Sequence, residues 1–157
     1  MKKLINIFCL ISFVFASVSN SQYQYTSRGK NGMVVSANHL ASEVGIKILK
    51  KGGNAIDAAV ATGFALAVTY PFAGNIGGGG YMIIQFANGN NTAIDFREQA
   101  PLNANRDMYL DESGNYVPSL SQEGATSVAV PGSVAGLIYA LEKYGTQSLK
   151  EVIQPAI

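Results

Sequence analysis

The sequence predicts an α+β fold in a single domain, and three observations support this. A nearly all-apolar helix begins at Asn54, a run of glycines follows at Gly77–Gly80, and a β-hairpin comes next over 81–98. Hydrophobic residues make up 48% of the 157 residues and charged residues 13%, which is typical of a chain with a large buried core. Disorder needs the opposite balance, low hydrophobicity with high net charge.

The N-terminus has the layout of a secretory signal peptide. Residues 1–3 include two lysines, residues 4–16 are apolar, and small polar residues follow. The apolar run is shorter than the roughly 20 residues of a membrane span, and an uncleaved anchor is the alternative. We therefore expect a signal peptide over 1–22, a domain over 23–157, and a periplasmic or secreted protein. The one cysteine, Cys9, lies in the apolar run, so the chain holds no disulfide framework or zinc site.

Two helices are predicted in the first half of the domain. Met33–Ser36 is a short strand candidate, and a helix over 39–51 has apolar residues at helical spacing and lysines before a glycine. The next helix begins at Asn54 with Asp57 in a capping-box position. Pro71 ends it, because proline cannot continue a helix.

A β-hairpin follows the glycine run. The strand over 81–86 is apolar at nearly every position, so we expect it to be covered on both faces. Asn and Gly at 88–90 tolerate the positive φ of a hairpin turn. In the return strand over 92–98, alternation places Asp95 and Arg97 on the face opposite the apolar residues.

The second half has weaker signals. Residues 102–126 are polar and rich in turn residues, and a short strand is predicted over 127–130. A helix over 132–144 follows a proline. Ser148 and Glu151 form a capping-box pattern that opens a last helix.

Arg97 is the best single candidate for binding a ligand. Its planar guanidinium matches a carboxylate with two parallel hydrogen bonds. A structural ion pair with Asp95, with Glu98 or with a later acidic residue is the alternative. Glu98 is a candidate brace for Arg97, and a solvated charge at the strand end is equally compatible with the pattern.

The glycines Gly77, Gly78, Gly79 and Gly80 do not form a nucleotide-binding loop. No Lys-Ser/Thr pair follows them, and they lie between a helix and a strand, the reverse of the dinucleotide order. We interpret them sterically, as side-chain-free positions that let strands and substrate lie close together.

Other chemistry is poorly supported. The net charge of +1 and the lack of a Lys/Arg stripe argue against nucleic acid. The only histidine, His39, stands at a helix start, which favours a surface or capping role over a catalytic base. No Gly-x-Ser-x-Gly motif surrounds any serine, and no metal site is expected.

Four sequence blocks lie in a fixed order: GGNAIDAAVA at 52–61, GNIGGGGYM at 74–82, TAIDFREQAP at 92–101 and SVAVPGSVAGL at 127–137. Together they resemble the large-subunit core of gamma-glutamyltransferases (gamma-glutamyltranspeptidases). The resemblance runs from about Gly32 to Ile157.

The resemblance implies an N-terminal nucleophile hydrolase, a four-layer αββα sandwich of which this chain supplies the N-terminal part of the large subunit. In that family the precursor cuts itself, and the N-terminal threonine of the small subunit attacks glutathione or another γ-glutamyl amide. Water, an amino acid or a peptide then takes the glutamyl group, and no metal or organic cofactor is required. The nucleophilic threonine falls beyond residue 157, so we expect no catalytic residue in this chain and an inactive fragment.

The resemblance also gives Arg97 a role, because the arginine of the DFRE motif holds the α-carboxylate of the γ-glutamyl group. Two alternatives remain open. One is a non-catalytic secreted module that binds an amino-acid carboxylate through Arg97. The other is a related acylase of the same fold, such as one acting on acylated β-lactam side chains.

Overall fold

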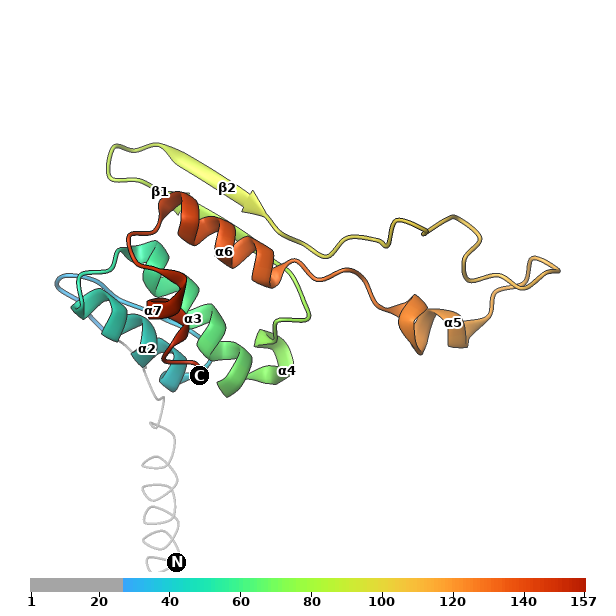
Figure 1. Ribbon diagram of the computed structural model, residues 1–157, viewed down its shortest axis with the longest axis horizontal. Coiled ribbons are helices and arrows are strands. Elements are labelled where there is room, and N and C mark those ends of the chain that lie inside the picture. The colour runs from blue at the N-terminus through green and yellow to red at the C-terminus, as the bar shows by residue number, and fades with distance from the viewer. Residues whose placement is uncertain (1–26) are drawn as a thin grey trace, which may run out of the picture. The chain divides into compact units, whose positions relative to one another are not determined.

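The computed structural model describes residues 27–157, so the predicted signal peptide over 1–22 lies outside the described residues. Residues 32–157 form one structural unit. In this unit a β-hairpin lies against helices of both halves of the chain (Figure 1). This mixture of helices and a sheet confirms the α+β prediction. None of the helices among residues 27–157 has the length and apolar character needed to cross a membrane.

Helix α2 (His39–Lys50) begins at the expected N-cap. The Asn38 side chain accepts a hydrogen bond from the Leu40 N–H at 2.9 Å, and its amide donates to the carbonyl of Thr69 at 3.2 Å. The strand predicted over 33–36 is wrong. No strand within residues 27–157 pairs with this segment, and Val34 instead packs against α2 at Gly45.

Helix α3 (Ala55–Thr69) is the centre of the core. The predicted capping box is confirmed, because the Asn54 side chain accepts from the Asp57 N–H while Asp57 accepts from the Asn54 N–H. The helix ends before Pro71 as expected. Pro71 then opens the short helix α4 (Pro71–Gly74), which precedes the glycine run.

Strands β1 (Tyr81–Gln85) and β2 (Asn91–Asp95) pair antiparallel, with Tyr81 opposite Asp95. Gly89 takes a φ of +86° in the turn, as its position predicted. The inner face of the hairpin packs on the helices through Met82, Ile84, Phe86 and Ile94. The prediction that β1 is covered on both faces is wrong for the described residues, because Tyr81 is 65% and Ile83 82% exposed on the outer face.

The segment between the hairpin and the next long helix carries α5 (Pro118–Gln122) and the 3₁₀ turn η1 (Ala125–Ser127). An isolated antiparallel bridge between Gln99 and Val130 closes it. The strand predicted over 127–130 is therefore wrong except at Val130. Its partner Gln99 lies past the end of β2 at Asp95, and the bridge between them is isolated.

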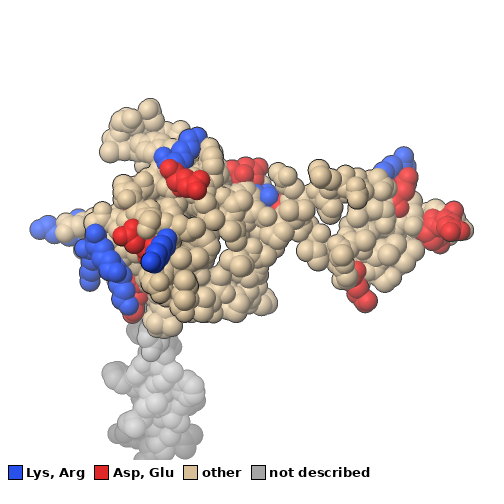
Figure 2. Space-filling view, viewed as in Figure 1, with Lys and Arg blue, Asp and Glu red and all other residues tan. Residues whose placement is uncertain are grey.

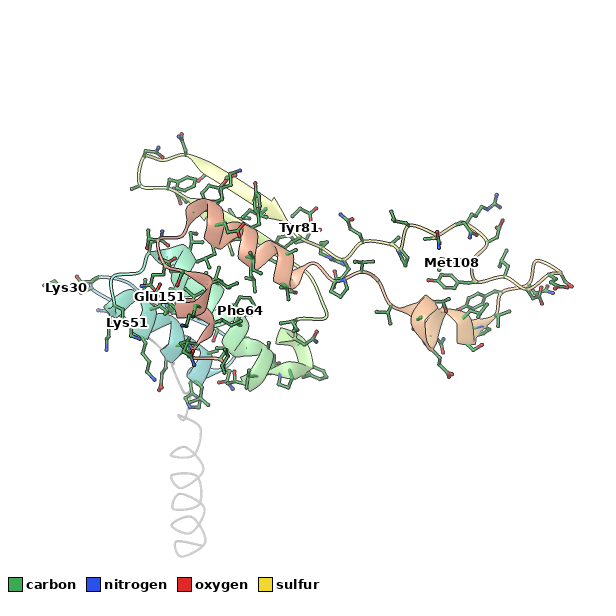
Figure 3. The ribbon with its side chains drawn as sticks, viewed as in Figure 1. Lys30, Lys51, Phe64, Tyr81, Met108 and Glu151 are labelled. Carbon is green, nitrogen blue, oxygen red and sulfur yellow. The ribbon has the colours of Figure 1, made fainter. Side chains whose placement is uncertain are left out.

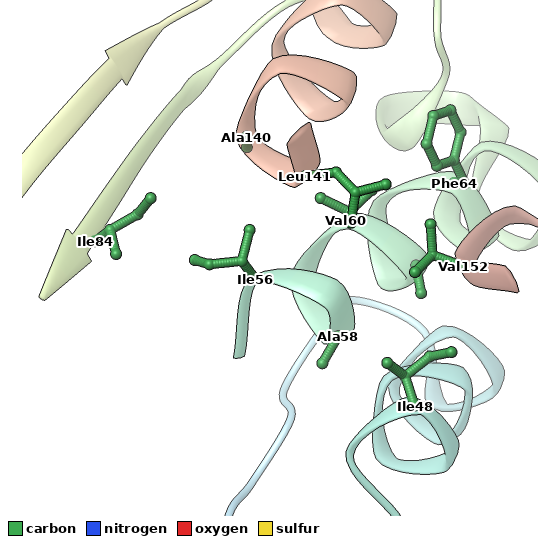
Figure 4. Close-up of a cluster of buried hydrophobic side chains, with 10 residues drawn as sticks. Ile48, Ile56, Ala58, Val60, Phe64, Ile84, Ala140, Leu141 and Val152 are labelled. Atoms are coloured by element: carbon green, nitrogen blue, oxygen red, sulfur yellow. The ribbon is translucent and has the colours of Figure 1, made fainter. Parts of the chain in front are cut away.

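Helices α6 (Ser133–Tyr144) and α7 (Leu149–Ile153) complete the unit and confirm the last two predicted helices. The Ser148 capping box is also present. Figure 4 shows the buried cluster that joins the hairpin to four helices. Its larger members are Ile48 of α2, Ile56, Val60 and Phe64 of α3, Ile84 of β1, Leu141 of α6 and Val152 of α7.

Candidate functional site

Arg97 lies two residues past the end of β2, where the chain is still held beside β1. Phe96 and Gly80 exchange both backbone hydrogen bonds, at 3.0 and 3.3 Å. The Asp95 side chain accepts a hydrogen bond from the Arg97 N–H at 3.0 Å. Asp95 therefore fixes the backbone of Arg97, while the guanidinium of Arg97 forms its hydrogen bond with Glu98.

The guanidinium of Arg97 pairs with Glu98. Its Nε donates to Oε2 of Glu98 at 2.9 Å, and the Arg97 side chain remains 59% exposed. This hydrogen bond is the main cause that raises the pKa of Arg97. The pKa of Glu98 is lowered, first by its own backbone N–H and then by Arg97. The structure shows this contact between Glu98 and Arg97, and the role of Glu98 as a brace stays a prediction.

Tyr81 forms a third side of this group, which sequence reasoning missed. The Arg97 guanidinium carbon lies 6.0 Å from the centre of the Tyr81 ring, at the limit of a cation–π contact. Figure 3 shows Tyr81 near the end of the hairpin from which the chain leaves β2. No short-range pattern in the sequence signals this contact, because it depends on the register in which β1 and β2 pair.

The glycine run lies against the backbone that carries Arg97 and Glu98. A Cβ at Gly79 would lie 2.6 Å from the Phe96 carbonyl oxygen and 2.7 Å from the Glu98 nitrogen, closer than real Cβ atoms come. Gly80 faces the Phe96 ring, and the Gly78 carbonyl accepts from the first N–H groups of α6. The two backbone segments thus lie close together, most sharply at Gly79, whereas a Cβ at Gly77 would meet the side chain of Asn75 at 3.2 Å.

The other candidate residues stay apart from this group. His39 is exposed at the first position of α2, as expected. Among residues 27–157, no three His, Cys, Asp or Glu side chains gather as metal ligands would. Basic and acidic side chains are mixed on the face in Figure 2, with lysines over α2, whose last turn carries Lys47 and Lys50.

The site therefore presents the exposed guanidinium of Arg97, which Asp95 and Glu98 hold in place through hydrogen bonds. The glycine run lies beside it. The hydrogen bond from Arg97 within the described residues uses Nε, so the two terminal nitrogens remain available to a ligand. A guanidinium in this state can donate hydrogen bonds from its two terminal nitrogens to the two oxygens of one carboxylate.

A family model described as Gamma-glutamyltranspeptidase matches residues 41–157. The chain belongs to the gamma-glutamyltranspeptidase family. The match includes the hairpin, the glycine run and Arg97.

Individual members of the gamma-glutamyltranspeptidase family agree. A glutathione hydrolase proenzyme of Pseudomonas sp. strain A14 is 60% identical over 128 residues, which is 82% of this chain and 22% of that protein. The crystal structure of Helicobacter pylori gamma-glutamyltranspeptidase superimposes with a TM-score of 0.79 at 56% identity, covering 83% of this chain and 38% of that one. The Acylase ACY 1 proenzyme of Pseudomonas sp. strain V22 is 47% identical over 82% of this chain and 24% of its own length.

The described residues thus adopt part of the gamma-glutamyltranspeptidase fold, with one sheet layer and its helical cover. The chain spans about 22% of the length of the glutathione hydrolase proenzyme of Pseudomonas sp. strain A14.

Proposed function

We propose that this chain is the donor-binding part of a glutathione hydrolase or gamma-glutamyltransferase proenzyme, and that Arg97 binds the α-carboxylate of the γ-glutamyl group. The observation that carries the proposal is the state of Arg97. Its Nε is engaged by Glu98, its exposed terminal nitrogens can still form a bidentate pair, and Asp95 holds its backbone.

The remaining parts of the proposal follow from family membership. The reaction is transfer of the γ-glutamyl group of glutathione or a related amide to water, an amino acid or a peptide. The nucleophilic threonine belongs to a small subunit cut from the same precursor, beyond residue 157. The relatives from Pseudomonas sp. strains A14 and V22 carry the name proenzyme, which supports such processing. The protein acts in the periplasm or outside the cell, in keeping with the leader-like residues 1–22.

The test uses a full-length protein. The matched segment of the Pseudomonas sp. strain A14 relative is replaced by the corresponding residues of this chain, and steady-state kinetics are measured with a chromogenic γ-glutamyl anilide. We expect Arg97→Ala to raise KM by about 10- to 100-fold, because a charged bidentate contact is lost. Arg97→Lys keeps the positive charge but loses the planar pair of donors, so we expect its KM to lie between that of the parent and that of Arg97→Ala.

Arg106→Ala is the matched control. The Nε of Arg106 also lies near the acid that follows it, 3.8 Å from Oδ1 of Asp107, but Arg106 belongs to the segment between β2 and α5 and its side chain is 97% exposed. Its KM stays at the parent value. An unchanged KM for Arg97→Ala removes Arg97 from the donor site and leaves the proposed role without support.

An acylase is the second candidate, because the Acylase ACY 1 proenzyme matches the same part of the chain. The two activities differ in what Arg97 meets, since a γ-glutamyl donor carries an α-carboxylate and a simple acyl side chain does not. Assaying the same chimera with a γ-glutamyl anilide and with an acylated β-lactam separates them. Preference for the β-lactam, unaffected by Arg97→Ala, favours the acylase.

A further inference from the structure

Exposed lysines gather at the C-terminal end of α2. Lys47 and Lys50 lie in its last turn, and Lys51 is its C-cap residue. Residues three and four apart are neighbours on a helix surface, so these three exposed side chains lie close together. Figure 2 shows the lysines over α2. The dipole of α2 favours cations at this end, which accounts for part of the cluster.

Helix α7 brings a fourth lysine to the same place. Lys150 of α7 and Lys51 line one cleft, although they are far apart in the sequence. The dipole of α2 does not explain a lysine that comes from another helix. Within residues 27–157 none of the four lysines forms an ion pair, because the ion pairs of that part are formed by arginines. We call Lys47, Lys50, Lys51 and Lys150 the lysine patch.

The cleft between Lys51 and Lys150 has a volume of about 560 Å³ and is rich in hydrogen-bond donors. Beside the two ammonium groups it is lined by two amide side chains, those of Gln147 and Gln154. The acid that lines it is Glu151, which Figure 3 labels together with Lys51. Its Oε2 accepts hydrogen bonds from the N–H and the hydroxyl of Ser148 at 2.9 and 2.7 Å, so this carboxylate is engaged in the cap of α7. Ammonium groups are compact point charges that suit a phosphate, whereas the planar guanidinium matches a carboxylate.

The lysine patch differs in charge from the rest of the structural unit. In residues 32–157 acidic side chains outnumber basic ones, and every lysine there except Lys143 belongs to the patch. Figure 2 shows acidic side chains over the segment that carries α5, away from α2. A local excess of one sign attracts a surface of the opposite sign even where the net charge does not. The patch therefore predicts an anionic partner.

We propose that the lysine patch binds the headgroups of an anionic lipid surface, with one lipid phosphate in the cleft between Lys51 and Lys150. The leader-like residues 1–22 have the pattern of a chain that is exported across a membrane. The lysines extend beyond the cleft, which suits a surface better than a single small anion. No aromatic side chain lines the cleft for base stacking, so a nucleic acid fits less well. The cleft lies outside the Arg97 site, so this inference goes beyond the proposed function.

Vesicle sedimentation tests the proposal with the full-length chimera described above, made without its N-terminal leader so that no apolar leader inserts into the bilayer. We expect the chimera to sediment with vesicles that contain phosphatidylglycerol and not with pure phosphatidylcholine vesicles. Salt releases it as the concentration rises from about 20 mM to about 500 mM. A lysine near an anionic surface strengthens binding about fivefold, so Lys51→Gln weakens binding by about that factor and the double variant with Lys150→Gln by about 25-fold. Lys143→Gln, the same charge change on α6, is the matched control and stays within about twofold of the parent.

Further measurements separate this ligand from the alternatives. Lys51→Arg keeps the charge and binds vesicles like the parent, and KM for the γ-glutamyl anilide stays at the parent value in the lysine variants, which shows that they are folded. Calorimetry with inorganic phosphate alone tests for a free anion in the cleft. The proposal is overturned by a lack of binding to anionic vesicles, by vesicle binding that the double variant retains, or by phosphate binding without vesicle binding. Arg97→Ala leaves vesicle binding unchanged, so a failure of the proposed donor site is recognised separately.

Discussion

Thr146 donates two hydrogen bonds to the carboxylate of Asp57, one from its backbone N–H at 2.8 Å and one from its hydroxyl at 2.6 Å. Asp57 has no exposed surface. Its two oxygens also accept from the N–H groups of Asn54 and Gln147. One buried carboxylate thus joins the start of α3 to the loop between α6 and α7.

This network predicts a loss of stability in acid. Burial raises the pKa of Asp57, but the hydrogen bonds from Thr146, Asn54 and Gln147 outweigh it, and the pKa lies below its ordinary value. The unfolded chain therefore binds the proton more tightly than the folded chain. The contribution of Asp57 is complete above the unfolded pKa of about 3.9 and is lost as the pH falls through the folded value.

Asp57→Asn checks this by urea unfolding across that pH range. At neutral pH we expect the free energy of unfolding to fall by about 2–4 kcal/mol, because one amide oxygen cannot serve all the donors that meet the carboxylate. The gap between the variant and the parent narrows in acid. Asp107→Asn, at an exposed carboxylate, is the control and stays near the parent curve. If the difference in the free energy of unfolding between Asp57→Asn and the parent did not change with pH, the folded structure would not hold Asp57 in its ionised form.

Helices α2, α3 and α6 and the hairpin could be predicted from sequence because their signals are local. Asn54 with Asp57 and the Asn-Gly turn act within a few residues. The segments at 33–36 and 127–130 were misjudged because a strand needs a neighbour, and sequence spacing does not supply one. The second role of Asp57 depends on Thr146, 89 positions away, and no short-range pattern reveals it.

In the candidate site, too, the contacts between sequence neighbours could be predicted and the contacts between strands could not. The DFRE motif identified Arg97, and its pairing with Glu98 joins neighbours in sequence. The ring of Tyr81 approaches Arg97 because β1 and β2 pair in one register out of several. That register became known only with the structure.

Glu98 is expected to position Arg97 without taking part in bond making. In the chimera, Glu98→Ala should raise KM for the γ-glutamyl anilide by about tenfold with a smaller change in kcat, because the guanidinium loses its fixed orientation. Glu98→Gln keeps an acceptor for Nε and should recover most of the loss. Glu112→Ala, at an exposed turn residue, serves as the control. Equal KM values for Glu98→Ala and the parent would argue that Arg97 orients itself.

Tyr81 is expected to act through its ring. Tyr81→Phe preserves the aromatic face over Arg97 and should leave KM within about twofold of the parent. Tyr81→Ala should raise KM several-fold. The matched control is Ile83→Ala, two residues along the same exposed face of β1. If both alanine variants raise KM equally, the effect comes from the face of the hairpin and the contact with Arg97 is irrelevant.

Gly79 is expected to tolerate no side chain, and its neighbour provides the comparison. A Cβ at Gly79 meets backbone atoms of Phe96 and Glu98 at 2.6 and 2.7 Å, whereas one at Gly78 meets the Glu98 side chain at an ordinary 3.4 Å. Backbone cannot swing aside as a side chain can, so Gly79→Ala must separate the two segments. We expect it to lower the free energy of unfolding by about 1–3 kcal/mol, and Gly78→Ala to cost clearly less. In the chimera, Gly79→Ala should also raise KM, because the displaced segment carries Arg97. Equal melting temperatures for the two variants would mean that the backbone contact at Gly79 is looser than the structure shows.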